Sequence, residues 1–372
     1  MLIVATRNYP PTVGGIETLC YALVRALHAQ GVSVHVVAPE APGSDRVDAI
    51  EPYPITRYSS RRTPGLKLYW AVSKVLQSHD APVLCGQWTS SSLLVVKRAL
   101  SNRPTRLLSF GHGKEFLLAG SAWRRSFFFA RYMREVLMRT EIVAISRYTA
   151  SLAREAGAQK VHLLNPGVDT ARFTLGCSNP LPAQLVGMKR PRLLTVARLV
   201  PRKGIDTVIA ALPTIAKRHP NIQYLVAGEG PDLPRLQSMT VERRIQDRVH
   251  FLGRVPDPQL PALYGEADLF VLLARQELKK REVEGFGLVL LEAQACGTPV
   301  IAARSGGMVD ALLEDQTGLA VPENDPSSFA QQAGDLLENS ARLSAMCTAA
   351  RAHAVKNDWS QTATRLRSLL RI

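Results

Sequence analysis

Short apolar runs alternate with longer amphipathic stretches along the whole chain. Each run is almost continuously apolar, which is typical of strands buried on both faces of a parallel sheet. Amphipathic stretches such as residues 16–30, which end at Gly31, predict helices between them. The alternation predicts an α/β protein whose helices cover both faces of parallel sheets. The expected strands are residues 2–6, 32–38, 83–85, 107–110, 142–145, 161–164, 193–197, 222–227, 250–252, 268–273 and 299–303.

The number of these units and one break in the pattern indicate two domains. A chain of 372 residues is long enough for two cores. Residues 174–192 are polar, rich in Gly and Pro and without periodicity, so we predict a linker there. Two Rossmann-like domains, over residues 1–173 and 193–356, would then face each other. Neither first turn carries G-x-G-x-x-G, which argues against a dinucleotide dehydrogenase.

Apolar length and cysteine usage favour a cytoplasmic protein. No apolar run approaches the roughly 20 residues needed to span a bilayer. Residues 1–5 are apolar, but they are too short for a signal sequence and have no basic segment before them. The five cysteines are scattered and form no C-x-x-C pair, which argues against a disulfide framework or a zinc site.

The net charge of +15 is concentrated in one part of the chain. Between Arg57 and Arg139 there are fifteen Lys and Arg residues and three acidic ones. This asymmetry suggests a polyanionic partner, which could be nucleic acid, acidic lipid or a phosphorylated acceptor. A solvated surface that only keeps the protein soluble is the alternative.

Two basic stretches in this region contain aromatic residues. Helical projection of residues 123–139 places arginines and two Phe on one side, and Phe129, Met133, Val136 and Leu137 on the side expected to be core. Arg57 and Lys74 extend a second stretch around Trp70. Arginine interleaved with exposed Phe is typical of an interfacial membrane face, and no RRM, KH, zinc-finger or homeodomain signature supports nucleic acid. The predicted membrane or acceptor patch comprises Arg61, Arg62, Lys67, Arg124, Arg125, Phe127, Phe128 and Arg131.

The segment Glu-Gly-Phe-Gly-Leu-Val-Leu-Leu-Glu-Ala, residues 284–293, carries the strongest chemical signal. Gly285 and Gly287 suit a tight loop that approaches a ligand, and a helix is expected from about residue 288 to Cys296. The helix N-terminus would offer free N–H groups to a phosphate. Glu284 and Glu292 could accept hydrogen bonds from sugar or ribose hydroxyls, although an ordinary solvated helix edge is the alternative.

This segment resembles the donor site of glycosyltransferase family 4, in which two Glu are separated by seven residues. The run continues similarly through Gly297 to Ser305-Gly306-Gly307, and the likeness covers nearly the whole chain. The resemblance implies the GT-B fold, in which two Rossmann-like domains face each other across a cleft. It further implies that Glu284 contacts the donor sugar, Glu292 the ribose, and the backbone of Phe286, Gly287 and Leu288 the sugar hydroxyls and phosphate.

Two cations follow the first strand of the second domain. Arg198 and Lys203 at a helix entrance can neutralise a diphosphate, and no D-x-D metal motif occurs in the chain. In the family an Arg and a Lys in this setting replace the metal, so the resemblance implies a metal-independent enzyme without cofactors. A solvated basic turn is the alternative.

Smaller motifs in both domains match the same family. Gly14-Gly15 follows the first strand, and the resemblance places Gly15 near the β-phosphate. His112, between two glycines at a strand end, corresponds to a His close to the transferred sugar, although a lone His is often structural. Gly253-Arg254-Val255 resembles the base-reading loop, with Val255 as a backbone contact. Residues 357–372 resemble the terminal helix that returns to the first domain.

The charged loop at residues 275–283 and the flanking motifs are most similar to mannosyltransferases that act on phosphatidylinositol lipids. We therefore expect retaining transfer of a hexose, mannose from GDP-mannose being favoured and a UDP-sugar being possible, to a lipid-linked or membrane-associated acceptor in glycolipid or surface polysaccharide synthesis. The enzyme would lie at the inner face of the membrane. A soluble acceptor, a nucleotide-sugar epimerase and a nucleic-acid-binding protein on a degenerate transferase fold are the alternatives.

Overall fold

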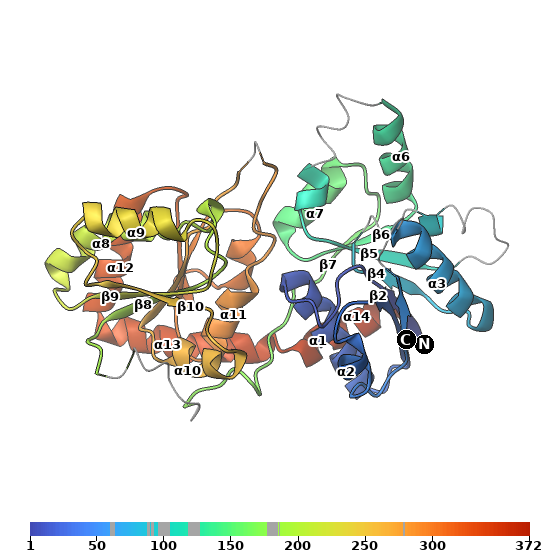
Figure 1. Cartoon of the computed structure of the whole chain (residues 1–372), viewed down its shortest axis with the longest axis horizontal. Helices are drawn as coiled ribbons and strands as arrows, with labels where there is room; N and C mark the ends of the chain where they lie inside the picture. The colour runs from blue at the N-terminus through green and yellow to red at the C-terminus, as the bar shows by residue number, and fades with distance from the viewer. Residues whose placement is uncertain are drawn as a thin grey trace. The chain divides into compact units, whose positions relative to one another are not determined.

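The computed structural model describes residues 1–59, 64–87, 90, 93–95, 105–117, 127–176, 185, 187–277 and 280–372. Within them the chain forms two compact α/β units (Figure 1). Unit 1 contains Met1–Gly167 together with Trp359–Ile372, and unit 2 contains Val168–Asp358.

Unit 1 is built on a parallel sheet in the order β3-β2-β1-β4-β5-β6-β7. Almost every side chain of its central strands is buried, as the apolar runs predicted. The described strands are β1 (Leu2–Ala5), β2 (Val34–Pro39), β3 (Ile55–Tyr58), β4 (Val83–Cys85), β5 (Leu107–Gly111), β6 (Glu141–Ala144) and β7 (Val161–Leu163). The described helices are α1 (Gly15–Ala29), α2 (Ser44–Asp48), α3 (Pro64–Ser78), α6 (Phe127–Met138), α7 (Arg147–Glu155) and α14 (Trp359–Leu370).

Unit 2 repeats the design with a parallel sheet in the order β10-β9-β8-β11-β12-β13. The described strands are β8 (Arg192–Val196), β9 (Gln223–Ala227), β10 (Val249–Gly253), β11 (Leu269–Leu272), β12 (Val300–Ala303) and β13 (Gly318–Val321). The described helices are α8 (Ile205–Arg218), α9 (Leu233–Glu242), α10 (Leu260–Gly265), α11 (Leu288–Ala295), α12 (Pro326–Glu338) and α13 (Ser340–Lys356), with short 3₁₀ turns at η2 (Pro201–Lys203), η3 (Asp257–Gln259) and η4 (Met308–Ala311). Two Rossmann-like parallel-sheet units are therefore confirmed.

Each sheet has a point where its strand order reverses. This point lies between β1 and β4 in unit 1 and between β8 and β11 in unit 2. Loops that leave the carboxyl ends of such neighbouring strands diverge, and ligands of α/β proteins bind there. The Gly14-Gly15 loop follows β1, and the loops that carry Lys203 and Glu284 follow β8 and β11. The fold thus brings the predicted motifs of each unit to the binding edge of its sheet.

Two strands, β3 and β13, were absent from the predicted set, and both lie at an edge of their sheet. In β3 the residues Ile55, Thr56 and Arg57 are only partly buried, so the strand lacks an apolar run. β13 begins with a glycine, so its apolar run is only three residues long. A Cβ on Gly318 would lie 2.2 Å from the carbonyl oxygen of Val300. Edge strands pair on one side only, and their sequences carry a weaker pattern.

The boundary between the units differs from the predicted one. It falls after Gly167, whereas the first domain was predicted to end at residue 173. Residues 168–173 group with unit 2 because the Arg351 guanidinium donates to the Phe173 carbonyl oxygen at 2.8 Å and the Phe173 ring packs on Tyr264. The described residues of the predicted linker 174–192 also belong to unit 2, and Arg192 opens β8.

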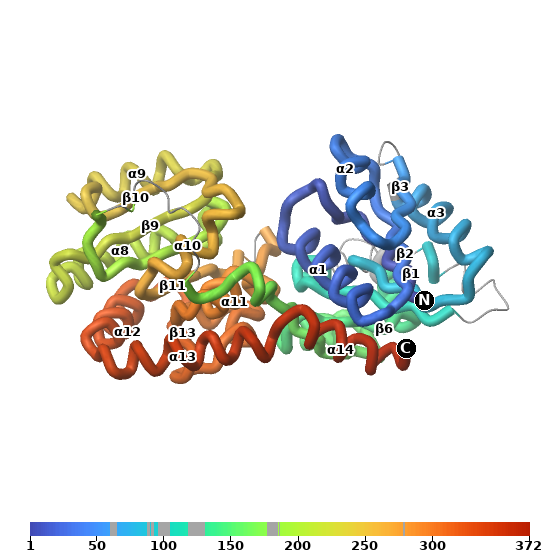
Figure 2. The backbone as a smooth tube through the Cα atoms, turned by 90° about the horizontal axis from the view of Figure 1, so that it is seen from below, coloured from blue at the N-terminus to red at the C-terminus, as the bar shows by residue number. Residues whose placement is uncertain are grey.

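The C-terminal helix α14 packs in unit 1, beside α1 (Figure 2). Ala363 and Leu366 on its inner face are fully buried. Gln30 donates a 2.7 Å hydrogen bond to the carbonyl oxygen of Ser360, and Arg106 donates one of 2.9 Å to that of Leu369. The last helix is thus a structural part of the unit formed by the first half of the chain.

The predicted basic region is partly neutralised within unit 1. Arg57, expected to extend the basic stretch around Trp70, is instead paired with Asp48 at 2.7 Å and has a side chain only 11% exposed. Arg106 is paired with Glu141 at 2.8 Å. Both acidic partners lie outside the segment over which charge was counted, so that count overstates the free positive charge.

The rest of the predicted patch is described only in part. Met133, Val136 and Leu137 are buried and Arg131 is exposed on α6, as the helical projection predicted. Trp70 on α3 is 62% exposed. Among the residues that the structure describes, no helix has the length and apolar composition to cross a membrane. Outside the described residues lie Arg61, Arg62, Arg124 and Arg125, together with the side chains of Phe127 and Phe128.

Candidate active site

Glu284 lies in the loop between β11 and α11, and its carboxylate holds two cations. Lys203 Nζ lies 2.6 Å from Glu284 Oε2, and Arg202 Nη1 donates to the same oxygen at 2.9 Å. The three side chains are between 13% and 20% exposed. Burial by itself raises the pKa of the Glu284 carboxyl, but the neighbouring Lys203 and Arg202 charges outweigh burial and lower that pKa to about 2. Glu284 is therefore an ionised acceptor throughout the physiological pH range.

Three glycines bring the backbone segments of this site close together. A Cβ on Gly204 would lie 1.9 Å from the Leu273 carbonyl oxygen, so glycine lets the lysine loop pack directly on the end of β11. A Cβ on Gly306 would lie 2.2 Å from the Glu284 carbonyl oxygen. The amide of the next residue, Gly307, donates to that same oxygen at 3.0 Å. The Ser-Gly-Gly segment thus positions the backbone of Glu284.

The N-terminus of α11 follows Glu284 by three residues and has no side-chain cap. Gly287 is its N-cap residue, in the left-handed region with φ 85°, and Leu288 begins the helix. Phe286 is buried, 2% exposed, and anchors the turn. Uncapped N–H groups and the positive end of the helix dipole form a general anion site. The described structure therefore places Lys203 and Arg202 on one carboxylate, and a helix N-terminus begins three residues after it in the chain.

Glu292 lies inside α11, where its carboxyl group is buried and contacts a neutral hydroxyl group. Its Oε2 accepts a 2.7 Å hydrogen bond from the Tyr264 hydroxyl of α10. Burial raises the pKa of the Glu292 carboxyl, and the hydrogen bond from Tyr264 only partly offsets this. Tyr264 is fully buried, in contact with the Phe173 ring, and its own pKa is raised well above the usual value by burial and by the Glu292 charge. Tyr264 orients the Glu292 carboxyl.

The other predicted donor residues of unit 2 also follow strands of its sheet. Arg198 follows β8, and its exposed side chain makes no hydrogen bond or ion pair within the described part of the chain. Gly228 and Gly230 pack on that segment, since their Cβ atoms would lie 1.9 and 2.1 Å from the Ala197 and Leu199 carbonyl oxygens. Val255 follows β10 and is 9% exposed. Each of these positions lies just after a strand of the unit 2 sheet.

In unit 1, Gly15 begins α1, and its N-cap Gly14 provides no side-chain cap. A Cβ on Gly14 would lie 2.3 Å from a carboxylate oxygen of Glu17, so a larger residue would displace that side chain. The other Glu17 oxygen accepts a 2.7 Å bond from Asn8, whose oxygen in turn accepts one of 3.0 Å from Gln87. These bonds tie the α1 entrance to the ends of β1 and β4.

His112 follows β5 and is held at both its ring and its backbone. Its Nε2 lies 2.7 Å from the Gly86 carbonyl oxygen, which can only accept, so Nε2 carries the proton. Its backbone amide donates to Glu115 Oε1 at 2.6 Å. In a neutral ring the proton on Nε2 leaves Nδ1 as an acceptor. The Gly86 carbonyl and Glu115 thus fix His112 at the carboxyl end of β5.

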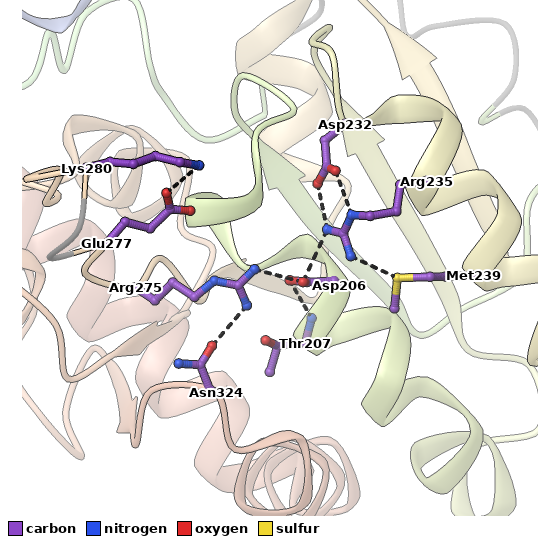
Figure 3. A network of polar contacts seen from close by, with 9 residues as sticks. All are labelled: Asp206, Thr207, Asp232, Arg235, Met239, Arg275, Glu277, Lys280 and Asn324. Carbon is purple, nitrogen blue, oxygen red and sulfur yellow. Dashed lines mark hydrogen bonds and ion pairs between the residues drawn. The ribbon is translucent and has the colours of Figure 1, made fainter.

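The charged loop at residues 275–283 is anchored to the body of unit 2 (Figure 3). Asp206 at the start of α8 lies between Arg275 and Arg235, whose Nη2 atoms are 2.8 and 3.2 Å from its Oδ2. Arg275 also donates to Asn324 at 2.9 Å, and Lys280 pairs with Glu277 at 2.8 Å. The loop is therefore held by charge pairs at its base and within itself.

Three residues of this site were not among those predicted from the sequence: Arg202, Tyr264 and Glu282. Arg202 directly precedes Lys203 in the sequence, and that adjacency was the available signal. Glu282, whose Oε2 lies 3.7 Å from Arg202 Nε, is part of the charged loop at residues 275–283, but nothing in that loop indicated its partner. Tyr264 carried no signal, because its contact with Glu292 joins positions far apart in the chain. Among the described residues no group of three or more His, Cys, Asp or Glu is placed to hold a metal ion.

Two family models and several proteins of full-length similarity match this chain. The model described as Glycosyltransferase Family 4 matches residues 13–172, and Glycosyl transferases group 1 matches residues 182–353. A GDP-mannose-dependent alpha-(1-6)-phosphatidylinositol monomannoside mannosyltransferase of Mycolicibacterium smegmatis is 31% identical over 384 residues, covering 99% of this chain and 98% of that protein.

Solved structures show the same two-domain architecture. Sucrose-phosphate synthase from Thermosynechococcus elongatus matches with a TM-score of 0.78 and 23% identity, over 100% of this chain and 98% of the other. HepE from Anabaena, solved in complex with UDP, matches with a TM-score of 0.77 and 18% identity, over 100% of this chain and 99% of the other. The matched models, the full-length relative and the two parallel sheets agree: this chain belongs to the glycosyltransferases of family 4 and is a hexosyltransferase with the GT-B fold.

Proposed function

We propose that this enzyme is a retaining, metal-independent mannosyltransferase that transfers mannose from GDP-mannose to a lipid-linked acceptor of the phosphatidylinositol type. The observation that carries the proposal is the cluster in which Lys203 and Arg202 share one oxygen of Glu284 beside the uncapped start of α11. The mycolicibacterial relative, similar over its full length, is named as GDP-mannose-dependent and as acting on a phosphatidylinositol mannoside.

The cluster supports a role for protein cations where other transferases use a metal. The Lys203 ammonium has three donors, of which Glu284 accepts one, so it can also bind a diphosphate oxygen. The α11 N–H groups add a second source of positive potential. Such preorganised groups stabilise the negative charge that develops on the leaving diphosphate. Retention follows if the acceptor attacks the face that the diphosphate leaves, with a phosphate oxygen taking the acceptor proton.

The two glutamates divide recognition of the donor in this proposal. Glu284 is ionised and held by its cations, which suits acceptance of hydrogen bonds from sugar hydroxyls. Glu292, oriented by Tyr264, would accept from the ribose. His112 and Gly15 would act from unit 1, His112 near the sugar and Gly15 near the β-phosphate.

The first test is a transfer assay with GDP-mannose and, in parallel, UDP- and ADP-sugars. We expect GDP-mannose to be the preferred donor, EDTA to leave the rate unchanged, and an α-linked product. Lys203→Ala and Arg198→Ala should each lower kcat/KM. The loss should correspond to about 2 to 4 kcal/mol of transition-state stabilisation, the size of a lost contact to transition-state charge. Full activity of both variants, or loss of activity with EDTA and recovery with Mn²⁺, would rule out the proposed site chemistry.

The second test concerns the acceptor. Trp70 is 62% exposed, Leu66 beside it on α3 is 47% exposed, and Arg131 is exposed on α6. We expect co-sedimentation with vesicles that contain phosphatidylinositol and not with neutral vesicles, because basic side chains near an anionic surface contribute about 1 kcal/mol each. Charge reversal of Arg124, Arg125 and Arg131 should release the protein and leave donor binding intact. A protein that stays in the supernatant at low salt would point to a soluble acceptor.

A further inference from the structure

We propose that Glu282 is a positioning residue that holds Arg202 on one oxygen of Glu284 and so keeps the other oxygen open for a donor sugar hydroxyl. This inference rests on the proposed function, in which Glu284 binds the sugar. It assigns a purpose to the charged loop at residues 275–283.

The Arg202 guanidinium lies between two carboxylates. Its Nη1 donates to Glu284 Oε2 at 2.9 Å, and its Nε lies 3.7 Å from Glu282 Oε2. Lys203 Nζ shares Glu284 Oε2 at 2.6 Å. Both cations therefore meet the same oxygen of Glu284. No hydrogen bond from the described residues reaches Glu284 Oε1, which leaves it able to accept from a ligand.

Without Glu282, the Arg202 guanidinium would favour a different arrangement of hydrogen bonds to Glu284. An arginine facing a single carboxylate tends to form two parallel hydrogen bonds, one to each oxygen. Such a fork on Glu284 would occupy Oε1 as well as Oε2. Glu282 attracts the Nε edge of Arg202, so only one of its N–H groups faces Glu284.

The loop is built to keep Glu282 in this place. Glu277 and Glu282 form an antiparallel pair, with backbone hydrogen bonds of 2.9 and 3.2 Å between them. At the base of the loop Arg275 binds Asp206 and Asn324 (Figure 3). The backbone amide of Arg275 donates to the Arg202 carbonyl oxygen at 2.8 Å. The same loop therefore fixes the backbone of Arg202 and presents the carboxylate that meets its side chain.

The proposal is tested by calorimetry with GDP and with GDP-mannose on wild type, Glu282→Gln, Arg202→Met and the double variant. The ratio of the two dissociation constants isolates the contribution of the sugar. We expect Glu282→Gln to bind GDP-mannose about tenfold more weakly, the size of one hydrogen bond to a charged acceptor. Its affinity for bare GDP should equal that of the wild type. In the Arg202→Met background the same replacement should change nothing further, because no guanidinium is left to close Oε1.

Glu338→Gln is the matched control, since Glu338 pairs with Arg218 on the same unit at an exposed site away from Glu284. It should keep the wild-type ratio. Equal loss of GDP and GDP-mannose binding in Glu282→Gln, or the same loss with and without Arg202, would mean that Glu282 only stabilises the loop and would overturn the inference. A wild type that binds GDP-mannose no more tightly than GDP would instead refute the proposed donor, and the inference with it.

Discussion

Glu284 and Glu292 are eight positions apart in the chain, yet the fold gives their carboxyl groups opposite environments. Two cations lower the pKa of Glu284 to about 2. Burial beside a tyrosine hydroxyl raises the pKa of Glu292. A pair of carboxyl groups separated in this way can serve two tasks, one as a permanently charged acceptor and one as a group whose ionisation depends on its neighbours.

Glu284 makes acid stability a direct test of its ion pairs. Its folded pKa of about 2 lies below the ordinary 4.5, so its contribution is complete above pH 4.5 and is lost as the pH falls through about 2. Glu284→Gln should therefore destabilise unit 2 near neutral pH by about 2 to 3 kcal/mol, and by less as the pH falls. Urea unfolding at several pH values measures this. If the difference in unfolding free energy between wild type and Glu284→Gln does not shrink between pH 5 and pH 3, the pairing of Glu284 with its cations is contradicted.

Glu292 should control nucleotide binding. If its carboxylate accepts from ribose, Glu292→Gln weakens binding of bare GDP, whereas Glu284→Gln spares it and impairs transfer. Because the pKa of Glu292 is raised, GDP binding to the wild type should weaken as the pH falls through that raised value, and this pH dependence should disappear in Glu292→Gln. Calorimetry across pH follows both effects. Identical losses in the two variants would show that their roles are not divided.

At the scale of elements, the site depends on backbone segments that touch. At Gly204, after the turn η2, the backbone lies so close to the loop after β11 that there is no room for a Cβ atom. The same holds at Gly306, before η4, where the backbone packs on the Glu284 carbonyl. Strands β8, β11 and β12 are buried neighbours and fix where these loops leave the sheet. The positions of Lys203 and Glu284 are therefore set by rigid parallel strands, with glycines allowing the last contact.

A pair of glycine variants separates steric contact from backbone conformation. Gly204 and Gly253 both have positive φ, +70° and +64°, but a Cβ on Gly253 meets nothing within 4 Å. Gly253→Ala should cost about 1 kcal/mol of unfolding free energy for the left-handed conformation alone. Gly204→Ala should cost at least about 2 kcal/mol more, because the methyl group would overlap the Leu273 carbonyl. Equal costs in thermal or urea unfolding would show that the approach at Gly204 is not tight.

On the scale of the whole molecule, the chain builds its units out of sequence order. It leaves unit 1 after Gly167, completes unit 2, and returns to unit 1 with α14. The C-terminal helix therefore belongs to the compact unit formed by the first half of the chain, and α13 just before it belongs to unit 2. Residues close in sequence at this end of the chain should affect different unfolding transitions.

Leu366 on α14 and Met346 on α13 test this division. They are 0% and 2% exposed. Truncation of a buried Leu or Met to Ala costs about 2 to 5 kcal/mol in the unit that buries it. Leu366→Ala should thus lower the unfolding transition of unit 1, and Met346→Ala that of unit 2, as followed by hydrogen exchange of β5 and of β12. Loss of protection in the same strand with both variants would contradict the separate units.

The sequence by itself determined the α/β class, the two domains, the buried central strands and the positions of the glutamates, Lys203 and the glycine loops. These follow from local periodicity and from short motifs, which act within a few residues of one another. Tertiary structure alone decided the edge strands β3 and β13, the boundary at Gly167, and the pairing of Arg57 with Asp48. It also decided that Arg202 contacts Glu284, that Tyr264 contacts Glu292, and that Glu282 lies beside Arg202. Such contacts join loops from different strands, and no pattern along the chain records which charges the folded sheet brings together.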